Sequence, residues 1–256
     1  MSERILLGAT LPQFTDDPRR FKEGVRRAEA AGLDSIWVFD HLWPLSGSKQ
    51  RPILEQWTSL AWAAEATDSI RIGTLVTRSS LRNARLLTHM VQTVSDIAGD
   101  RLIVGIGSGD HKSRDENEAF GIPYWGGDER IQQLEDTVVL LRDHLPIGAR
   151  LWVGGRSDDA LSLAARYADG WNGWGGSPAA FASDAATVAS LAGRRAVEPT
   201  WGGVIRESGA PAVARRLSAY VEAGARHLVC TFPEAWRPDL YEDLGAEVKQ
   251  LIQSGR

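Results

Sequence analysis

Cysteine is almost absent from this chain of 256 residues, and its scarcity excludes two kinds of protein. The single cysteine, Cys230, allows neither an internal disulfide framework nor a metal site built from several thiolates. Because Cys230 lies in the apolar run 227–232, we expect a small buried hydrophobic side chain there and not a nucleophile. The five histidines are scattered and form no HExxH motif, so the sequence predicts no metal site.

Runs of one charge and long apolar runs are also missing. The formal net charge is −4 and no cluster of Lys or Arg forms a basic stripe, so we expect no nucleic-acid partner. No apolar stretch reaches the roughly 20 residues that cross a bilayer, and residues 1–7 do not resemble a secretion signal. We therefore expect a cytoplasmic protein with no membrane partner.

Tryptophan, by contrast, is abundant. The chain has ten Trp against six Phe and four Tyr, within a composition that is 43% hydrophobic and 24% charged. That overall balance is typical of a globular protein with a sizeable core. The tryptophans themselves fit two interpretations, core packing or a cavity for a flat aromatic ligand, and composition leaves both open.

Short apolar runs recur along the chain and alternate with helical patterns. Several runs are almost continuously apolar, which is typical of parallel strands covered on both faces. Asp17 followed by Pro18 predicts a helix start, with Phe21, Val25 and Ala28 on its buried face. The expected strands are residues 5–11, 35–40, 70–77, 102–107, 151–155, 170–175, 200–205 and 227–232.

Another helical pattern precedes Gly99. Leu86, Met90, Val94 and Ile97 recur at helical spacing there, so we expect them to form the buried face of that helix.

Glycines at helix ends support a repeating strand–helix unit. Gly32 and Gly224 each follow a helical pattern and precede an expected strand, which predicts a left-handed backbone at both. Eight strands alternating with eight helices, without a linker, predict one closed (β/α)₈ TIM barrel, a single domain over residues 1–256. An open doubly wound sheet is the alternative, but residues 10–14 after the first strand lack its GxGxxG motif.

The second expected strand ends in a carboxylate beside a histidine, Asp40 and His41. The active sites of such barrels are built from the loops that follow the strands. A carboxylate next to an imidazole can orient it and make it a proton donor or a polarising group. The spacing fits equally well an aspartate that caps a turn beside a histidine bonded to a backbone carbonyl.

Glycines also mark the end of the fourth strand. Gly105, Gly107 and Gly109 alternate with larger residues, so a planar ligand would have room against the backbone near Gly107 and Ser108. A string of this kind is a weak signal by itself, and its position at a strand end strengthens it.

The fifth strand leads into a turn that resembles an anion site. Exposed N–H groups at a helix start, two glycines and an arginine predict a phosphate cradle. An ordinary capped turn is the other interpretation. The residues concerned are Gly154, Gly155, Arg156 and Ser157.

Taken together, the order and spacing of these motifs resemble the luciferase-like monooxygenase superfamily. This superfamily comprises the bacterial luciferase-like flavin enzymes and their coenzyme F-420-dependent relatives. The matching segments are residues 28–41, 57–67, 70–77, 96–109, 120–123, 130–141, 153–155 and 168–172.

The resemblance implies a barrel that holds a flavin or a 5-deazaflavin at the ends of its strands. It places a bulge with a non-prolyl cis peptide at Leu75-Val76, followed by Thr77, behind the ring system. Asp110 and the Asp40-His41 pair would lie near the ring, and residues 154–157 near the phosphate. Because a short turn joins Leu145 to the fifth strand, we expect a barrel with trimmed insertions and, in keeping with the resemblance, a homodimer.

The predicted function is hydride transfer between coenzyme F-420 and a small organic substrate. His41 would be the proton source and Asp40 its orienting partner. One alternative is an FMN-dependent monooxygenase that uses oxygen. A second, from another class, is a catalytically silent flavin-binding protein.

Overall fold

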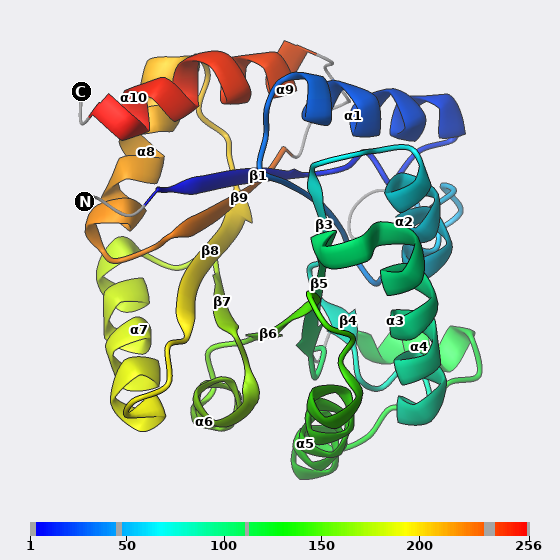
Figure 1. Ribbon diagram of the computed structural model, residues 1–256. Helices are drawn as coiled ribbons and strands as arrows, with labels where there is room; N and C mark the ends of the chain where they lie inside the picture. Colours follow the sequence, from blue (N-terminus) through cyan, green and yellow to red (C-terminus); the bar gives the residue numbers. More distant parts are fainter. Residues whose placement is uncertain (1–3, 45–47, 111–112, 233–238, 255–256) are drawn as a thin grey trace.

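A computed structural model describes residues 4–44, 48–110, 113–232 and 239–254 as a ring of parallel strands surrounded by helices (Figure 1). Each strand pairs in parallel with its neighbours, and the ring closes because β3 also pairs with β5. The predicted barrel is confirmed. Its strands are β1 (Leu6–Thr10), β2 (Ser35–Val38), β3 (Arg71–Thr74), β4 (Thr77–Arg78), β5 (Leu102–Gly107), β6 (Arg150–Gly154), β7 (Gly170–Trp174), β8 (Glu198–Val204) and β9 (His227–Thr231).

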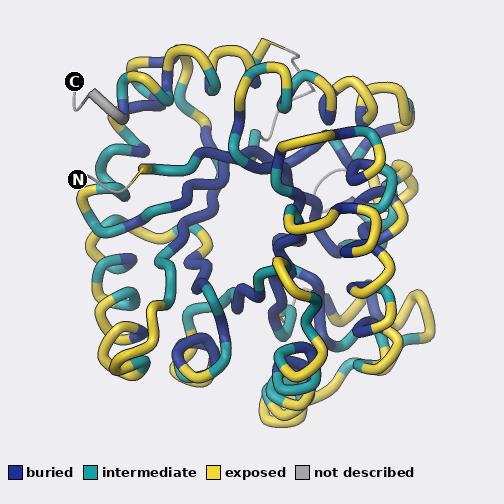
Figure 2. Tube along the Cα trace, in the orientation of Figure 1, coloured by how far each residue is buried: buried dark blue, intermediate teal, exposed yellow. Residues whose placement is uncertain are grey.

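Helices cover the outside of this ring, with their outer faces exposed and the strands buried (Figure 2). None of the helices in the described parts of the chain is long and apolar enough to cross a membrane. The helices are α1 (Pro18–Ala30), α2 (Gln56–Glu65), α3 (Ala84–Ala98), the 3₁₀ turn η1 (Gly99–Arg101), α4 (Arg114–Ala119), α5 (Gly127–His144), α6 (Asp158–Tyr167), α7 (Pro178–Ala192), α8 (Ala210–Glu222), α9 (Asp239–Asp243), the π-helical turn η3 (Leu244–Val248) and α10 (Lys249–Ser254).

The third expected strand is present in two pieces. β3 pairs with β5 up to Gly73, and β4 resumes the pairing at Thr77 opposite Ile106. Between the two pieces the Leu75-Val76 peptide bond is cis. The bulge and the cis bond that the resemblance placed there are both confirmed.

Local signals at helix ends are also confirmed. Asp17 is the N-cap of α1 and accepts a hydrogen bond from the Arg19 N–H, with Pro18 in the first helical position. Gly32 and Gly224 have φ angles of 73° and 105°, in the region that only glycine adopts without strain. These residues fix where α1 and α8 stop and the next strands start.

The predicted buried face of α3 is wrong for two of its four residues, whereas Val94 is buried as expected. Leu86 and Ile97 are 54% and 40% exposed, whereas Leu87, Val91 and Ala98 are buried. Apolar residues occupy two adjoining faces of this helix, so helical periodicity does not by itself decide which of them faces the barrel. Packing against the strand layer decides it.

Two stacked tryptophans fill the centre of the barrel. The rings of Trp37 and Trp152 lie 4.7 Å apart between centroids. Glycines opposite make room for them, because a Cβ at Gly73 would lie 2.3 Å from the Trp37 ring and one at Gly170 2.6 Å from Trp152 Nε1. Core packing accounts for at least half of the ten tryptophans, because five of those in the described ranges are fully buried: Trp37, Trp57, Trp152, Trp171 and Trp201.

A buried histidine lies beside these rings at the amino ends of the strands. Trp37 Nε1 donates to Ser35 Oγ at 2.7 Å, and Ser35 Oγ forms a hydrogen bond with His227 Nε2, also at 2.7 Å. The Nδ1 atom of His227 faces Glu198 Oε1 at 3.7 Å. Burial lowers the pKa of His227, against the opposing effect of Glu198, and the imidazole is neutral.

This network predicts a loss of stability in mild acid. A free histidine protonates near pH 6.5 in the unfolded chain, whereas folded His227 resists protonation, so the free energy of unfolding falls as the pH drops below about 6.5. We expect the melting temperature of the wild type to fall between about pH 7 and pH 5, and that of His227→Gln to change less. Equal slopes for the two proteins would contradict the assignment.

Candidate active site

A cavity of about 1180 Å³ opens at the carboxyl ends of the strands. It is at the upper end of the range for small-molecule sites and has room for a large cofactor together with a substrate. All but one of the predicted site residues line it: Asp40, His41, Leu75, Val76, Gly107, Ser108, Asp110, Gly154, Gly155, Arg156 and Ser157. The exception is Thr77, which is buried and donates to Gln56 Oε1 at 2.7 Å.

The Asp40 carboxylate does not bind His41. It accepts two hydrogen bonds from Arg82, at 2.7 and 2.9 Å, and one from the backbone N–H of Arg78 at 2.8 Å. Neighbouring residues of an extended chain point to opposite sides, so the Asp40 carboxylate turns toward Arg82 while His41 turns elsewhere. The prediction that Asp40 orients His41 is therefore wrong.

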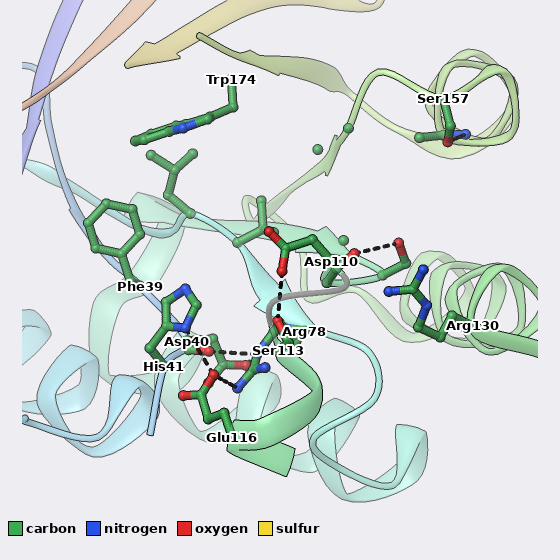
Figure 3. A pocket seen from close by; sticks show the side chains of 18 of the residues that line it. Phe39, Asp40, His41, Arg78, Asp110, Ser113, Glu116, Arg130, Ser157 and Trp174 are labelled. Atoms are coloured by element: carbon green, nitrogen blue, oxygen red, sulfur yellow. Dashed lines mark hydrogen bonds and ion pairs between the residues drawn. The ribbon is translucent and has the colours of Figure 1, made fainter. Parts of the chain in front are cut away.

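The partner of His41 is Glu116, on the short helix α4. Glu116 Oε2 lies 3.1 Å from His41 Nδ1, and its other oxygen accepts from the backbone N–H groups of Leu42 and Trp43. Its side chain is only 1% exposed, and Arg78 approaches it at 3.1 Å (Figure 3). Nothing in the local sequence marks this pairing, because 75 positions separate the two residues.

These contacts determine which ring nitrogen of His41 donates a hydrogen bond to Glu116. Burial alone would raise the pKa of Glu116, but the hydrogen bond with His41, that from the Leu42 N–H and the charge of Arg78 together hold it below its usual range. An ionised carboxylate only accepts, so Nδ1 of His41 donates to it. The Nε2 atom is then the ring nitrogen left for a ligand, and no described residue forms a hydrogen bond with it.

The back wall of the cavity is formed by Leu75 and Val76. A Cβ placed on Gly107 or on Gly154 would lie 2.8 Å from a methyl group of Val76. These two glycines therefore make room for the Val76 side chain. The result is a continuous apolar surface at the point where two strand ends meet.

The turn at residues 154–157 starts α6 as predicted. Gly155 has a φ of 134°, and Ser157 Oγ accepts from the Ala160 N–H as the N-cap. Arg156, however, turns toward α7 and donates from Nε to Asp184 at 2.6 Å. The Gly155 N–H donates to the Asn172 carbonyl, so an anion here would meet the N–H groups at the start of α6, and the arginine charge is already compensated.

The other end of the cavity is aromatic. Phe39 and Trp174 meet edge to face with ring centroids 5.8 Å apart, and both line the cavity with Trp43. Figure 3 shows Phe39, His41 and Trp174 on one side, and Arg130 and Ser157 on the other. The site thus has an apolar, aromatic half next to His41 and a polar half at the starts of α5 and α6.

Within the described ranges, no group of three His, Cys, Asp or Glu side chains is arranged to hold a metal. His144 bonds to the Leu140 carbonyl of its own helix, and His111 lies outside the described residues. Cys230 is buried, and burial raises the pKa of its thiol to about 12, so it is an inert core residue.

Residues 4–147 match the family model described as luciferase-like monooxygenase. Because the match covers more than half of the chain, this protein belongs to the luciferase-like monooxygenase family.

Among curated proteins, the chain is similar to an F420-dependent glucose-6-phosphate dehydrogenase of Amycolatopsis mediterranei, with 33% identity over 139 residues, 53% of this chain and 39% of that protein. A protein of the same name from Rhodococcus erythropolis is 29% identical over 76% of this chain and 56% of its own length. The chain thus spans about two fifths to just over half of the length of these two relatives.

Solved structures share the fold. An F420-dependent secondary alcohol dehydrogenase in complex with an F420-acetone adduct superposes with a TM-score of 0.81 and 16% identity, over 95% of this chain and 98% of that one. The EDTA monooxygenase of Chelativorans sp. BNC1 gives a TM-score of 0.78 and 14% identity, over 99% and 94%. Identities this low establish the barrel and not the activity.

Removing the Glu116 carboxylate will test how much of the site depends on it. In Glu116→Ala, buried Arg78 loses an ion-pair partner, which typically costs about 3 kcal/mol or more. The neighbouring Asp115 is exposed, so Asp115→Ala should change stability by less than about 0.5 kcal/mol. Urea unfolding of both variants measures the difference, and a similar small effect in both would contradict a structural role for Glu116.

Proposed function

We propose that this protein is an oxidoreductase that transfers a hydride between coenzyme F-420 and a small organic substrate. The observation that carries the proposal is the His41–Glu116 pair, which orients an imidazole at a cavity large enough for cofactor and substrate. The names of the curated relatives support the choice of cofactor.

The lining of the cavity fits a flat ring with a phosphorylated tail. The apolar wall of Leu75 and Val76 matches one face of a planar ring system. Gly107, Ser108 and Asp110 would flank the ring, and the turn at residues 154–157 would face the phosphate. A bound deazaflavin supplies a ring carbon that carries a hydride, while the protein orients the substrate and supplies the proton.

His41 is suited to proton transfer at the substrate oxygen. Because Nδ1 is held by Glu116, Nε2 accepts the proton when an alcohol is oxidised and returns it when a carbonyl is reduced. The hydroxyl or carbonyl oxygen of the substrate would lie within hydrogen-bond distance of Nε2. Phe39, Trp43 and Trp174 would enclose the carbon part of the substrate and exclude water.

Two alternative functions lead to different expectations. An FMN-dependent monooxygenase would use the same barrel and consume oxygen, as the name of one structural neighbour indicates. A catalytically silent flavin-binding protein would need no oriented imidazole, whereas here a buried carboxylate orients His41. Cytoplasmic location and homodimer formation, which we also infer, can be tested by cell fractionation and by sedimentation at several concentrations.

A binding titration distinguishes the cofactors. Trp43 and Trp174 line the cavity, so a bound chromophore should quench tryptophan fluorescence. We expect tighter binding of F-420 than of FMN. Equal or tighter binding of FMN, with oxygen uptake that depends on substrate, would reverse the assignment in favour of the monooxygenase.

Two substitutions test the proton-transfer role of His41. His41→Ala and His41→Gln should fold and bind F-420 like the wild type, because the apolar wall and the phosphate turn are untouched. Turnover should fall by roughly a hundredfold or more in both, the usual contribution of a general acid or base. His89→Ala, an exposed histidine on α3, is the matched control and should turn over normally. Normal turnover of His41→Ala together with a lower melting temperature would make His41 structural.

A further inference from the structure

Four Lys and Arg side chains line the cavity, and their charges are not equally compensated. Three of them form ion pairs within the protein: Lys49 with Asp115 at 3.7 Å, Arg78 with Glu116 at 3.1 Å and Arg156 with Asp184 at 2.6 Å. The fourth, Arg130, forms no ion pair with any residue in the described part of the chain. It is therefore the cavity-lining cation that a bound anion would neutralise.

Arg130 is held in place without being neutralised. It lies in the first turns of α5 and donates from one terminal nitrogen to the Tyr124 hydroxyl at 2.9 Å, with its guanidinium 5.2 Å from the centre of that ring. Its Nε atom is buried and has no hydrogen-bond partner among the described residues. A buried polar group without a partner is unfavourable, and more so when it is charged. The Tyr124 hydroxyl thus orients the Arg130 guanidinium but does not compensate its charge.

The position of Arg130 matches the proposed phosphate turn. Arg130 and Ser157 lie on the same side of the cavity, at the starts of the neighbouring helices α5 and α6 (Figure 3). The start of α6 contributes backbone N–H groups and the positive end of its dipole. Asp128 and Asp159, in the same first turns, also line the cavity and are exposed. A phosphate between the two helix starts would meet neutral donors on one side and a cation on the other.

We propose that Arg130, and not Arg156, is the cation that binds the phosphate of the cofactor. This inference rests on the proposed function, because it takes the phosphorylated deazaflavin as the ligand of the cavity. It corrects the assignment that sequence position gave to Arg156, whose charge is matched by Asp184. An arginine that donates to a phosphate forms charge-assisted hydrogen bonds, which are the stronger kind.

The test compares two ligands, intact F-420 and its deazaflavin–ribitol fragment, which has no phosphate. Binding is followed by quenching of tryptophan fluorescence. In Arg130→Ala, affinity for F-420 should fall roughly tenfold to a hundredfold, while affinity for the fragment is unchanged. Arg130→Lys keeps the charge and should lose less. It also provides the same comparison if the alanine variant does not fold.

Arg114→Ala is the matched control. Arg114 also lies over the Tyr124 ring, at 4.8 Å, but it does not line the cavity, so its removal should leave both affinities unchanged. An Arg130 variant that weakens both ligands equally, or neither, overturns the inference. A selective loss of F-420 in Arg156→Ala instead would return the role to Arg156. If wild-type protein binds neither ligand, the proposed function itself fails, which is a distinct result.

Discussion

The buried carboxylate of Glu116 organises the active end of this barrel. It joins three segments that are distant in the sequence: the loop after β2, the arginine that ends β4, and α4. Its oxygens accept from the Leu42 and Trp43 N–H groups, so it sets the path of the loop as well as the orientation of His41. The hydrogen bonds with His41 and with the Leu42 N–H, together with the charge of Arg78, lower the pKa of the carboxyl and keep it ionised, and the ionised carboxylate fixes which imidazole nitrogen faces the cavity. The chemistry proposed for the site depends on this one anion.

Short-range signals predicted the barrel because each acts within a few residues. A capped helix start at Asp17, a left-handed Gly32 and continuously apolar strands need no distant partner to be recognised. The cis bond at Leu75-Val76 came from the family resemblance, since nothing in local chemistry requires it. Where apolar residues covered two faces of α3, the local pattern was ambiguous, and two of the four residues predicted to be buried are exposed.

The sequence predicted where the site lies but not which side chains within it form hydrogen bonds with one another. Almost all of the expected residues line one cavity, because the carboxyl ends of parallel strands meet at one end of a barrel. Their partners, however, are set by side-chain direction. Asp40 adjoins His41 in the sequence but turns away to Arg82. Arg156 turns to Asp184 on α7, 28 residues further along the chain, where no local pattern could predict a partner. Adjacency in sequence is a poor guide to contact at a strand end, because neighbouring side chains diverge.

The glycines around Val76 have a consequence for how this cavity can be reshaped. Gly107 faces one methyl group of Val76 and Gly154 faces the other, so the three positions share a fixed volume. A methyl group added at either glycine is accommodated only if the facing methyl group of residue 76 is removed, and a change of Val76 to alanine removes both. Substitutions here should therefore be tolerated in compensating combinations and not singly, and an engineer seeking a deeper or differently contoured wall would redistribute volume among these three sites.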